Sequence, residues 1–263
     1  MSDESKYADL KLRMLSGIVL VLVGAATLIL GDLPFLFVFV LLAVVMTWEV
    51  VHLALQKSIL NIIVPAMMGL SIMAYVLLSW PWALGYLALT LMVYCFALKP
   101  KDMGIRVVMM VVIFLGIIGL IHLRFDIGLG SILWVLACVV ASDVGGYFAG
   151  RSFGGPKLWP AVSPKKTWSG TIGGWVLAAI VGLIFSRIYA EFDTSLALYG
   201  VVIAIFAQAG DLFESVLKRR AGIKDSSNLI PGHGGFLDRF DGVMGASLLV
   251  FIYIALTTNG LFA

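Results

Sequence analysis

Residues 15–30 read LSGIVLVLVGAATLIL, an apolar block without a charged side chain. A block of this kind is typical of a helix that crosses a lipid bilayer. A cleaved signal peptide would need a basic, acid-poor start and a small-residue cleavage site. This block instead follows a mixed-charge segment and ends at the turn sequence Gly31-Asp32-Leu33-Pro34. It therefore predicts a retained first membrane span.

Similar apolar blocks continue along the 263-residue chain. They predict further spans at roughly 35–55, 59–80, 82–98, 105–122, 127–149, 171–189, 195–217 and 242–261. In the whole chain 61% of residues are hydrophobic and 13% are charged, with a mean hydropathy of +1.06. Soluble domains are about 45–50% apolar and about 25% charged, so this composition excludes an ordinary soluble domain. We expect an all-α polytopic membrane protein with about nine transmembrane helices.

The distribution of basic residues predicts the orientation of these spans. Of the 18 Lys and Arg, all but Arg124 and Arg187 fall on one side of nine spans. By the positive-inside rule, the N-terminus is cytoplasmic and the C-terminus is outside. We expect an integral protein of the bacterial inner membrane. The net charge of +3 is too small to indicate a nucleic-acid partner.

The two longest polar stretches both lie in the second half of the chain. We therefore divide the sequence into an N-terminal membrane region, 1–126, with about five spans, and a catalytic membrane region, 127–263. The catalytic region carries the predicted cytoplasmic loops 150–170 and 218–241.

Acidic residues at membrane depth are costly and are usually functional or paired. The candidates are Glu49, Asp143, Asp211 and Glu214. Glu49 is near the end of its span, where its side chain could simply reach the surface. The small residues that follow Asp143 equally suit close helix packing.

The eighth span carries a polar face, because Asp211, Glu214, Ser215 and Lys218 follow one another at helical spacing. Two interpretations remain open for this face: a functional surface inside the bundle, or a network of side chains that pair with one another.

Loop 218–241 joins basic residues to glycines, including Gly232, Gly234 and Gly235, and to the carboxylates Asp238 and Asp241. Cations, free backbone amides and carboxylates are what Mg²⁺-dependent phosphate chemistry needs. A basic cytoplasmic loop is the alternative, but the positive-inside rule requires neither acids nor glycines. A single His does not make a zinc site, so His233 either donates to phosphate or shapes the turn.

Loop 150–170 is not a P-loop, because Pro156 follows Gly155 where Lys is required. Its segment Ser163–Thr167 still places two cations beside two hydroxyls. This segment could be a phosphate cradle or a site for anionic lipid.

Residues 215–241 read SVLKRRAGIKDSSNLIPGHGGFLDRFD and closely resemble the signature of the phosphatidate cytidylyltransferases, or CDP-diacylglycerol synthases. The pattern S-x-x-K-R-x-x-x-x-K-D, then P-G-H-G-G-x-x-D-R-x-D, is matched at every fixed position. Upstream elements, among them Gly210–Ser215 and Ser163–Trp168, resemble the family in the expected order. The family usually carries Glu where this chain has Ser169, so that carboxylate's role is minor, replaced or absent here.

The resemblance implies the reaction of CTP with phosphatidate to give CDP-diacylglycerol and pyrophosphate, in a membrane and with Mg²⁺ or another divalent cation. It assigns the metal to Asp211 and Asp238. We expect catalytic roles for Asp211, Asp238, Lys218 and Lys224, and substrate binding by Ser163, Lys165, Lys166, Thr167, Ser215, Arg219, His233, Gly234, Gly235, Arg239 and Asp143. A homodimer is the oligomer we consider.

Two other function classes compete with this reading. A CTP-dependent lipid or polyprenol kinase would use the same phosphate chemistry. A polytopic transporter would place its polar groups near the bilayer midplane, whereas here they cluster at one membrane surface.

Overall fold

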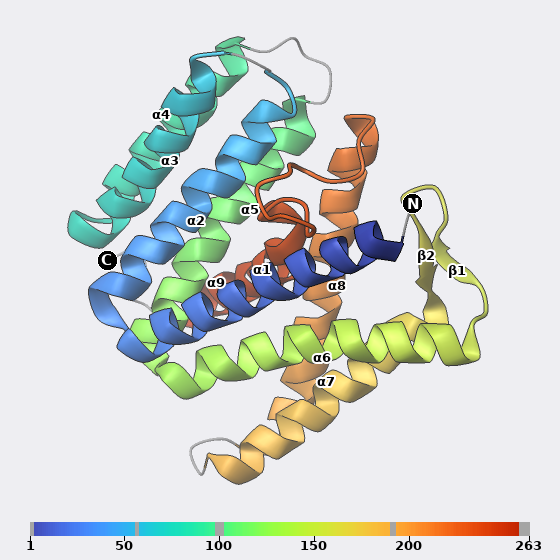
Figure 1. The fold of residues 1–263 in the computed structure, drawn as a ribbon. Helices are drawn as coiled ribbons and strands as arrows, with labels where there is room; N and C mark the ends of the chain where they lie inside the picture. Colours follow the sequence, from blue (N-terminus) through green and yellow to red (C-terminus); the bar gives the residue numbers. More distant parts are fainter. Residues whose placement is uncertain (1–2, 56–57, 98–102, 190–192, 258–263) are drawn as a thin grey trace. The chain divides into compact units, whose positions relative to one another are not determined.

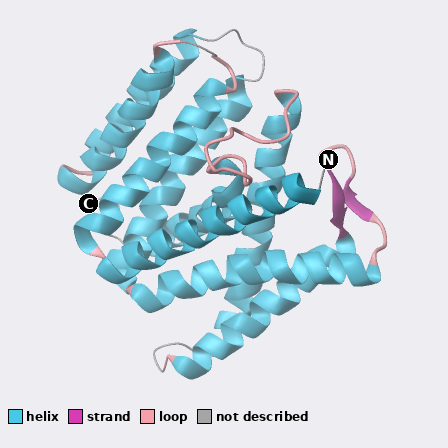
Figure 2. Ribbon diagram, viewed as in Figure 1, coloured by secondary structure: helices cyan, strands magenta, loops and turns pink. Residues whose placement is uncertain are grey.

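The computed structural model of the chain describes residues 3–55, 58–97, 103–189 and 193–257. Within these residues the chain folds almost entirely into helices (Figure 2). In chain order they are α1 (Asp3–Leu30), α2 (Asp32–His52), α3 (Leu60–Leu77), α4 (Trp80–Ala97), α5 (Met103–His122), α6 (Leu129–Phe153), α7 (Trp168–Ile188), α8 (Leu196–Arg220) and α9 (Leu237–Thr257) (Figure 1). A short π-helical segment, η1 (Leu123–Ile127), follows α5.

Nine helices in the described part of the chain are long and apolar enough to cross a membrane. The prediction of an all-α polytopic membrane protein with about nine spans is therefore confirmed. Its orientation stays a prediction. Lys57, Lys99 and Lys101, which entered the charge count, lie outside the described residues, and so does the C-terminus (258–263).

The polar segments between the last helices are shorter than expected. Helix α6 continues to Phe153, and α9 already begins at Leu237, so Asp238 and Asp241 are helical. The segment 150–170 also contains a hairpin of β1 (Lys157–Trp159) and β2 (Ser163–Thr167), paired antiparallel. Hydropathy marks where the apolar run stops, but a helix continues for as long as its backbone hydrogen bonds are satisfied.

The described residues form two compact units. Unit 1 contains those within 3–117 and 220–240, and unit 2 contains those within 118–219 and 241–257. The loop that follows α8 thus belongs with the N-terminal helices. The predicted division at residue 126 concerned the site of catalysis and stays a prediction.

Unit 1 has an apolar core in which α2 packs on α3 and α3 packs on α4. Phe35, Met46, Met68 and Tyr94 are fully buried there. Lipid tails are as apolar as these side chains, so inside a bilayer this packing stabilises the unit through van der Waals contacts and not through removal of the side chains from water.

Unit 2 is built on close contacts between helices that present glycine. Helices α6 and α7 lie side by side (Figure 1), and a Cβ on Gly145 would be 2.7 Å from the carbonyl oxygen of Gly173. Small residues allow such close approach of helices within a membrane. The packing interpretation of the glycines after Asp143 is therefore confirmed.

Helices α8 and α9 cross at a second glycine contact in unit 2. A Cβ on Gly210 would overlap the carbonyl oxygen of Asp241, and one on Gly245 would overlap that of Phe206. The two backbones touch, and this contact brings the start of α9 within unit 2 next to Asp211.

Candidate active site

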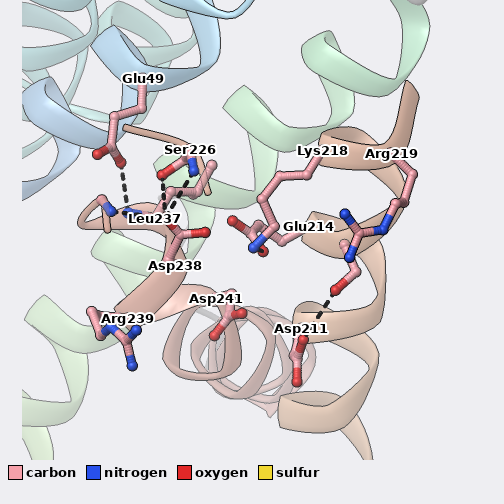
Figure 3. Close-up of polar contacts among 12 residues, drawn as sticks. Glu49, Asp211, Glu214, Lys218, Arg219, Ser226, Leu237, Asp238, Arg239 and Asp241 are labelled. Atoms are coloured by element: carbon pink, nitrogen blue, oxygen red, sulfur yellow. Dashed lines mark hydrogen bonds and ion pairs between the residues drawn. The ribbon is translucent and has the colours of Figure 1, made fainter. Parts of the chain in front are cut away.

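Asp238 lies in the first turn of α9, and neutral donors of the preceding loop hold its carboxylate (Figure 3). Its Oδ2 accepts hydrogen bonds from the Ser226 backbone N–H at 2.8 Å, the Ser226 hydroxyl at 2.9 Å and the Gly235 N–H at 2.8 Å. A negative charge at a helix N-terminus is favourable, and three donors on one oxygen fix its orientation.

The loop before Asp238 turns at glycines with left-handed backbone conformations, Gly232 at φ 75° and Gly234 at φ 84°. Residues with a Cβ rarely adopt these angles. The turn is closed by hydrogen bonds from the Ile230 N–H to the Gly234 carbonyl, 2.8 Å, and from the His233 N–H to the Ile230 carbonyl, 2.9 Å. The glycine-rich run is therefore an ordered turn.

His233 and Arg239, two predicted substrate-binding residues, both support this turn. The His233 Nδ1 shares a hydrogen bond of 2.8 Å with the Ser16 hydroxyl of α1. The Arg239 guanidinium donates from Nε at 2.9 Å and from Nη2 at 2.7 Å to the His233 carbonyl oxygen. These contacts favour a turn-shaping role for His233, and its contact with phosphate stays a prediction.

Asp211 lies on α8 (Figure 3), and its carboxylate pairs with a lysine of the hairpin. Its Oδ2 forms an ion pair with the Lys166 ammonium of β2, and its Oδ1 accepts a 3.3 Å hydrogen bond from the Ser215 hydroxyl. Glu214, which is fully buried, pairs with Lys218 one turn further on. The polar face of α8 is therefore self-paired at Glu214, whereas Asp211 reaches another element.

Three carboxylates gather in unit 2. Asp143 of α6 and Asp241 of α9 each lie within electrostatic range of Asp211 and of one another. The positive charge of Lys166 attracts the Asp143 carboxylate, and that of Lys218 attracts the Asp241 carboxylate. Carboxylates that share a site repel one another, and a bound cation relieves this repulsion.

This donor set fits Mg²⁺, which prefers oxygen ligands. Among the described residues, no three His, Cys, Asp or Glu side chains converge closely enough to hold a metal by themselves. Mg²⁺ usually binds through one or two carboxylates, several waters and the phosphates of a substrate. Asp211 lies in unit 2 and Asp238 is bound within unit 1, so their shared metal stays a prediction.

The hairpin places the remaining predicted residues of unit 2. Ser163 and the exposed Lys165 lie on β2, and the Arg219 Nε donates to the Val162 carbonyl at 3.3 Å. Thr167 caps α7, because its Oγ1 accepts from the Gly170 N–H at 3.1 Å. Ser169, at the position of the family's usual Glu, donates to the Gly154 carbonyl. Lys224, in unit 1, is exposed.

Sequence reasoning missed Gln208, which joins three helices of unit 2. Its Nε2 donates to the Ser142 hydroxyl at 3.0 Å, and its Oε1 accepts from the Trp175 indole at 3.1 Å. Ser142 precedes Asp143, and Gln208 lies one turn before Asp211. The amide within an apolar span was the available signal, because polar groups inside membranes find partners.

Comparisons with known proteins identify the family of the chain. A model of the cytidylyltransferase family matches residues 11–257. The phosphatidate cytidylyltransferase of Bacillus subtilis (strain 168) is 30% identical over 273 residues, which cover 94% of this chain and 98% of the relative. That of Staphylococcus haemolyticus (strain JCSC1435) is 32% identical over 255 residues, 89% of this chain and 95% of the relative.

A shorter stretch is more strongly conserved in a third relative. The phosphatidate cytidylyltransferase of Brucella suis biovar 1 (strain 1330) is 44% identical over 131 residues. The aligned part spans about half of each protein, 49% of this chain and 48% of the relative. With a family model that matches nearly the whole chain and two relatives aligned over most of it, the chain belongs to the cytidylyltransferase family.

Proposed function

We propose that the protein transfers the cytidylyl group of CTP to phosphatidate, giving CDP-diacylglycerol and pyrophosphate for phospholipid synthesis. The observation that carries the proposal is the alignment over most of the chain with two relatives named phosphatidate cytidylyltransferase. The nine apolar helices are consistent with a lipid substrate that stays in the bilayer.

In the proposed reaction, a phosphate oxygen of phosphatidate attacks the α-phosphorus of CTP. The bond from the α-phosphorus to the oxygen that bridges to the β-phosphorus breaks, and pyrophosphate leaves with that electron pair. A phosphate monoester is already largely ionised at neutral pH, with a second pKa of about 6. The protein therefore needs no strong general base, and alignment and charge neutralisation supply the catalysis.

We assign Mg²⁺ or another divalent cation to the carboxylates of Asp211 and Asp238. When bound, the ion neutralises charge on the reacting phosphates. Asp143 and Asp241 place two further carboxyl groups within electrostatic range of Asp211. Asp238 contributes a carboxylate, and hydrogen bonds from the loop fix its orientation before any substrate binds.

Lys166 is proposed to have two partners in turn. Its ammonium neutralises Asp211 in the structure. A nucleotide phosphate offers the same ammonium another anion, so Lys166 releases Asp211 to its metal role as CTP binds. The cations proposed to stabilise the leaving pyrophosphate are Lys218, Arg219, Lys224 and Arg239. The residues proposed to contact substrate are Ser163, Lys165 and Ser215.

We place this site on the cytoplasmic face of a bacterial plasma membrane, because nearly all Lys and Arg fall on that side. In a variant without native cysteines, Lys157→Cys in the hairpin should react with an impermeant maleimide only in opened cells. Thr194→Cys, before α8, should react in intact cells. The reverse labelling pattern would overturn the orientation.

The function is tested with purified protein in micelles that contain phosphatidate and CTP labelled at either the α- or the γ-phosphorus. The proposal expects the α-label in a chloroform-soluble product and the γ-label in pyrophosphate. A γ-label in the lipid, with CDP as co-product, would identify a kinase and reject the proposal. Absence of lipid labelling by either nucleotide, in protein shown to be folded, would also reject it.

A further inference from the structure

Glu49 is a carboxylate of α2 that the proposed mechanism does not use. It is fully buried, at 0% exposed, in the last turns of the helix. An ionisable group buried within a membrane span is costly unless hydrogen-bond partners compensate it. Its partners therefore indicate what the residue does.

Among the described residues, the donors to the Glu49 carboxylate come from the part of unit 1 that follows α8. Its Oε1 accepts from the Ser227 hydroxyl at 2.5 Å and from the Phe236 N–H at 2.9 Å. Its Oε2 accepts from the Leu237 N–H at 2.6 Å (Figure 3). The donors lie 178 to 188 residues away in the sequence.

These contacts cap the N-terminus of α9. Phe236 is the capping position, because its carbonyl accepts the first helical hydrogen bonds from Arg239 and Phe240, both at 3.0 Å. The first N–H groups of a helix have no partner within it, and a side chain next to them in sequence usually supplies one. Here a carboxylate from another helix does so, and its charge also suits the helix dipole.

The same segment holds Asp238. Ser226, which donates twice to Asp238, precedes Ser227, and Gly235 precedes Phe236. A Cβ on Gly235 would overlap both the Glu49 Oε1 and the Ser226 hydroxyl. The Glu49 carboxylate and the Asp238 carboxylate are therefore bound by adjacent residues of one tightly packed turn.

We propose that Glu49 is a positioning residue, which holds the glycine-rich turn and the first turn of α9 so that Asp238 meets metal and phosphate in one orientation. Glu49 acts through the turn, because its carboxylate accepts hydrogen bonds from Ser227, Phe236 and Leu237. The inference rests on the proposed function for its catalytic consequence, but the ordering of the turn is measurable without any substrate.

The test variant is Glu49→Gln, which keeps the size of the side chain. It replaces one acceptor oxygen by an NH₂ donor, so at least one of the three donors from Ser227, Phe236 and Leu237 loses its acceptor. The matched control is Thr47→Val. Thr47 is on the same helix and is equally buried, and its Oγ1 has no hydrogen-bond partner among the described residues.

Amide hydrogen exchange of the peptide 235–240 is measured first, in purified protein without CTP or phosphatidate. Glu49→Gln should exchange faster there than wild type, because the Phe236 and Leu237 N–H groups lose protection. Thr47→Val should exchange like wild type. Unchanged exchange in folded Glu49→Gln would overturn the proposal, whether or not the protein is a cytidylyltransferase.

Activity as a function of Mg²⁺ is measured second. Glu49→Gln should lower kcat and raise the Mg²⁺ concentration for half-maximal rate, together by about 10–100-fold, as when a hydrogen-bond partner of a metal ligand is removed. The KM for phosphatidate should not change. If Glu49→Gln only lowers the Tm, while kcat and the Mg²⁺ dependence of the folded protein stay at wild-type values, Glu49 is structural and the proposal is wrong.

If Glu49→Gln does not fold, Ser227→Ala removes one of the same hydrogen bonds from the other side. It should shift hydrogen exchange and Mg²⁺ dependence in the same direction by a smaller factor. A wild-type response in both measurements would overturn the proposal. A wild-type protein without transferase activity would reject the proposed function, and the exchange experiment would still decide whether Glu49 orders the turn.

Discussion

Asp238 and Asp211 are assigned to the same metal, yet the chain holds them by opposite means. Asp238 is bound by two backbone N–H groups and a hydroxyl, which are neutral donors with fixed positions. Asp211 is bound by the ammonium of Lys166, a mobile charge, and lies near two other carboxylates. The first arrangement fixes geometry, and the second balances charge. A substrate can displace a lysine, but it cannot displace the backbone of a turn.

The largest effect is expected from removing either charge. Asp211→Asn and Asp238→Asn should each lower kcat about a thousandfold, at the upper end of the cost of losing one electrostatic contribution to catalysis. An amide keeps the size of the side chain but loses the charge that a hard cation needs. Turnover and Mg²⁺ titrations are compared at equal yields of folded protein.

The same pair of variants also separates the two regions. In Asp238→Asn, amide exchange of the peptide 224–236 should increase, because the Ser226 and Gly235 N–H groups lose a charged acceptor. Asp211→Asn should leave that peptide unchanged. Near-wild-type turnover with unchanged Mg²⁺ dependence in either variant would show that the assigned metal ligands are wrong.

A steric change should reduce activity less than the loss of charge. Gly235→Ala places a Cβ against Glu49 and Ser226, and Gly210→Ala places one against the Asp241 backbone. We expect losses of about 10–100-fold in kcat for Gly235→Ala, as for disturbed supports of metal ligands. For Gly210→Ala we expect a stability loss of about 1–3 kcal/mol from overpacking.

Gly85→Ala is the control for both glycine variants, since nothing lies within 4 Å of its new Cβ. Activity assays and denaturation in mild detergent measure the outcome. A wild-type kcat in Gly235→Ala would mean that the turn tolerates rearrangement. Asp238 would then be no more rigidly held than Asp211, and the contrast between them would be wrong.

A smaller loss of activity is expected from Lys166→Met, together with a lower Mg²⁺ requirement. Loss of the ammonium should raise the KM for CTP and lower kcat, together by about tenfold, as for the loss of one charge-assisted hydrogen bond of about 1.5–3 kcal/mol. The Mg²⁺ concentration for half-maximal rate should fall, because the cation that competes for Asp211 is gone. Lys157→Met, on the neighbouring strand β1 of the same hairpin and exposed, is the matched control. A raised Mg²⁺ requirement in Lys166→Met would contradict the exchange of partners.

The smallest effect is expected from Asp225→Asn. This carboxylate is part of the signature but is exposed on the loop beside Lys224, and the resemblance assigns it no metal. Its turnover should remain well above that of the Asp211 and Asp238 variants in the same assay. A loss equal to theirs would bring Asp225 into the metal site and require a different ligand set.

The sequence was sufficient to predict the membrane fold, because nine apolar blocks are a local property that the bilayer dictates. The ends of the spans next to the polar segments were wrong by several residues. At Leu237 the helix starts where a remote carboxylate caps it, and hydropathy contains no information about such a cap. The β1–β2 hairpin was missed because short strands outside the apolar blocks leave no periodic signal.

The sequence names candidate site residues but not their contacts. Spacing and the signature single out Asp211, Lys166 and Asp238, and their roles stay a prediction. The pairing of Lys166 with Asp211, and the approach of Asp143 and Asp241, depend on which helices touch at Gly210 and Gly145. Such contacts join residues far apart in the chain, and a pattern along one sequence does not specify them.

The cap that Glu49 places on α9 has a consequence for how the protein is made. Glu49 leaves the ribosome 187 residues before Phe236, its partner at the helix start. At about 5–20 residues per second, translation takes roughly 10–40 s to cover that distance. During this interval the Glu49 carboxylate lacks the three groups that donate hydrogen bonds to it in the folded chain. Synthesis thus reaches the start of α9 before Glu49 can accept all of its hydrogen bonds, and a chain that stops before α9 lacks both the Leu237 donor and the Asp238 carboxylate.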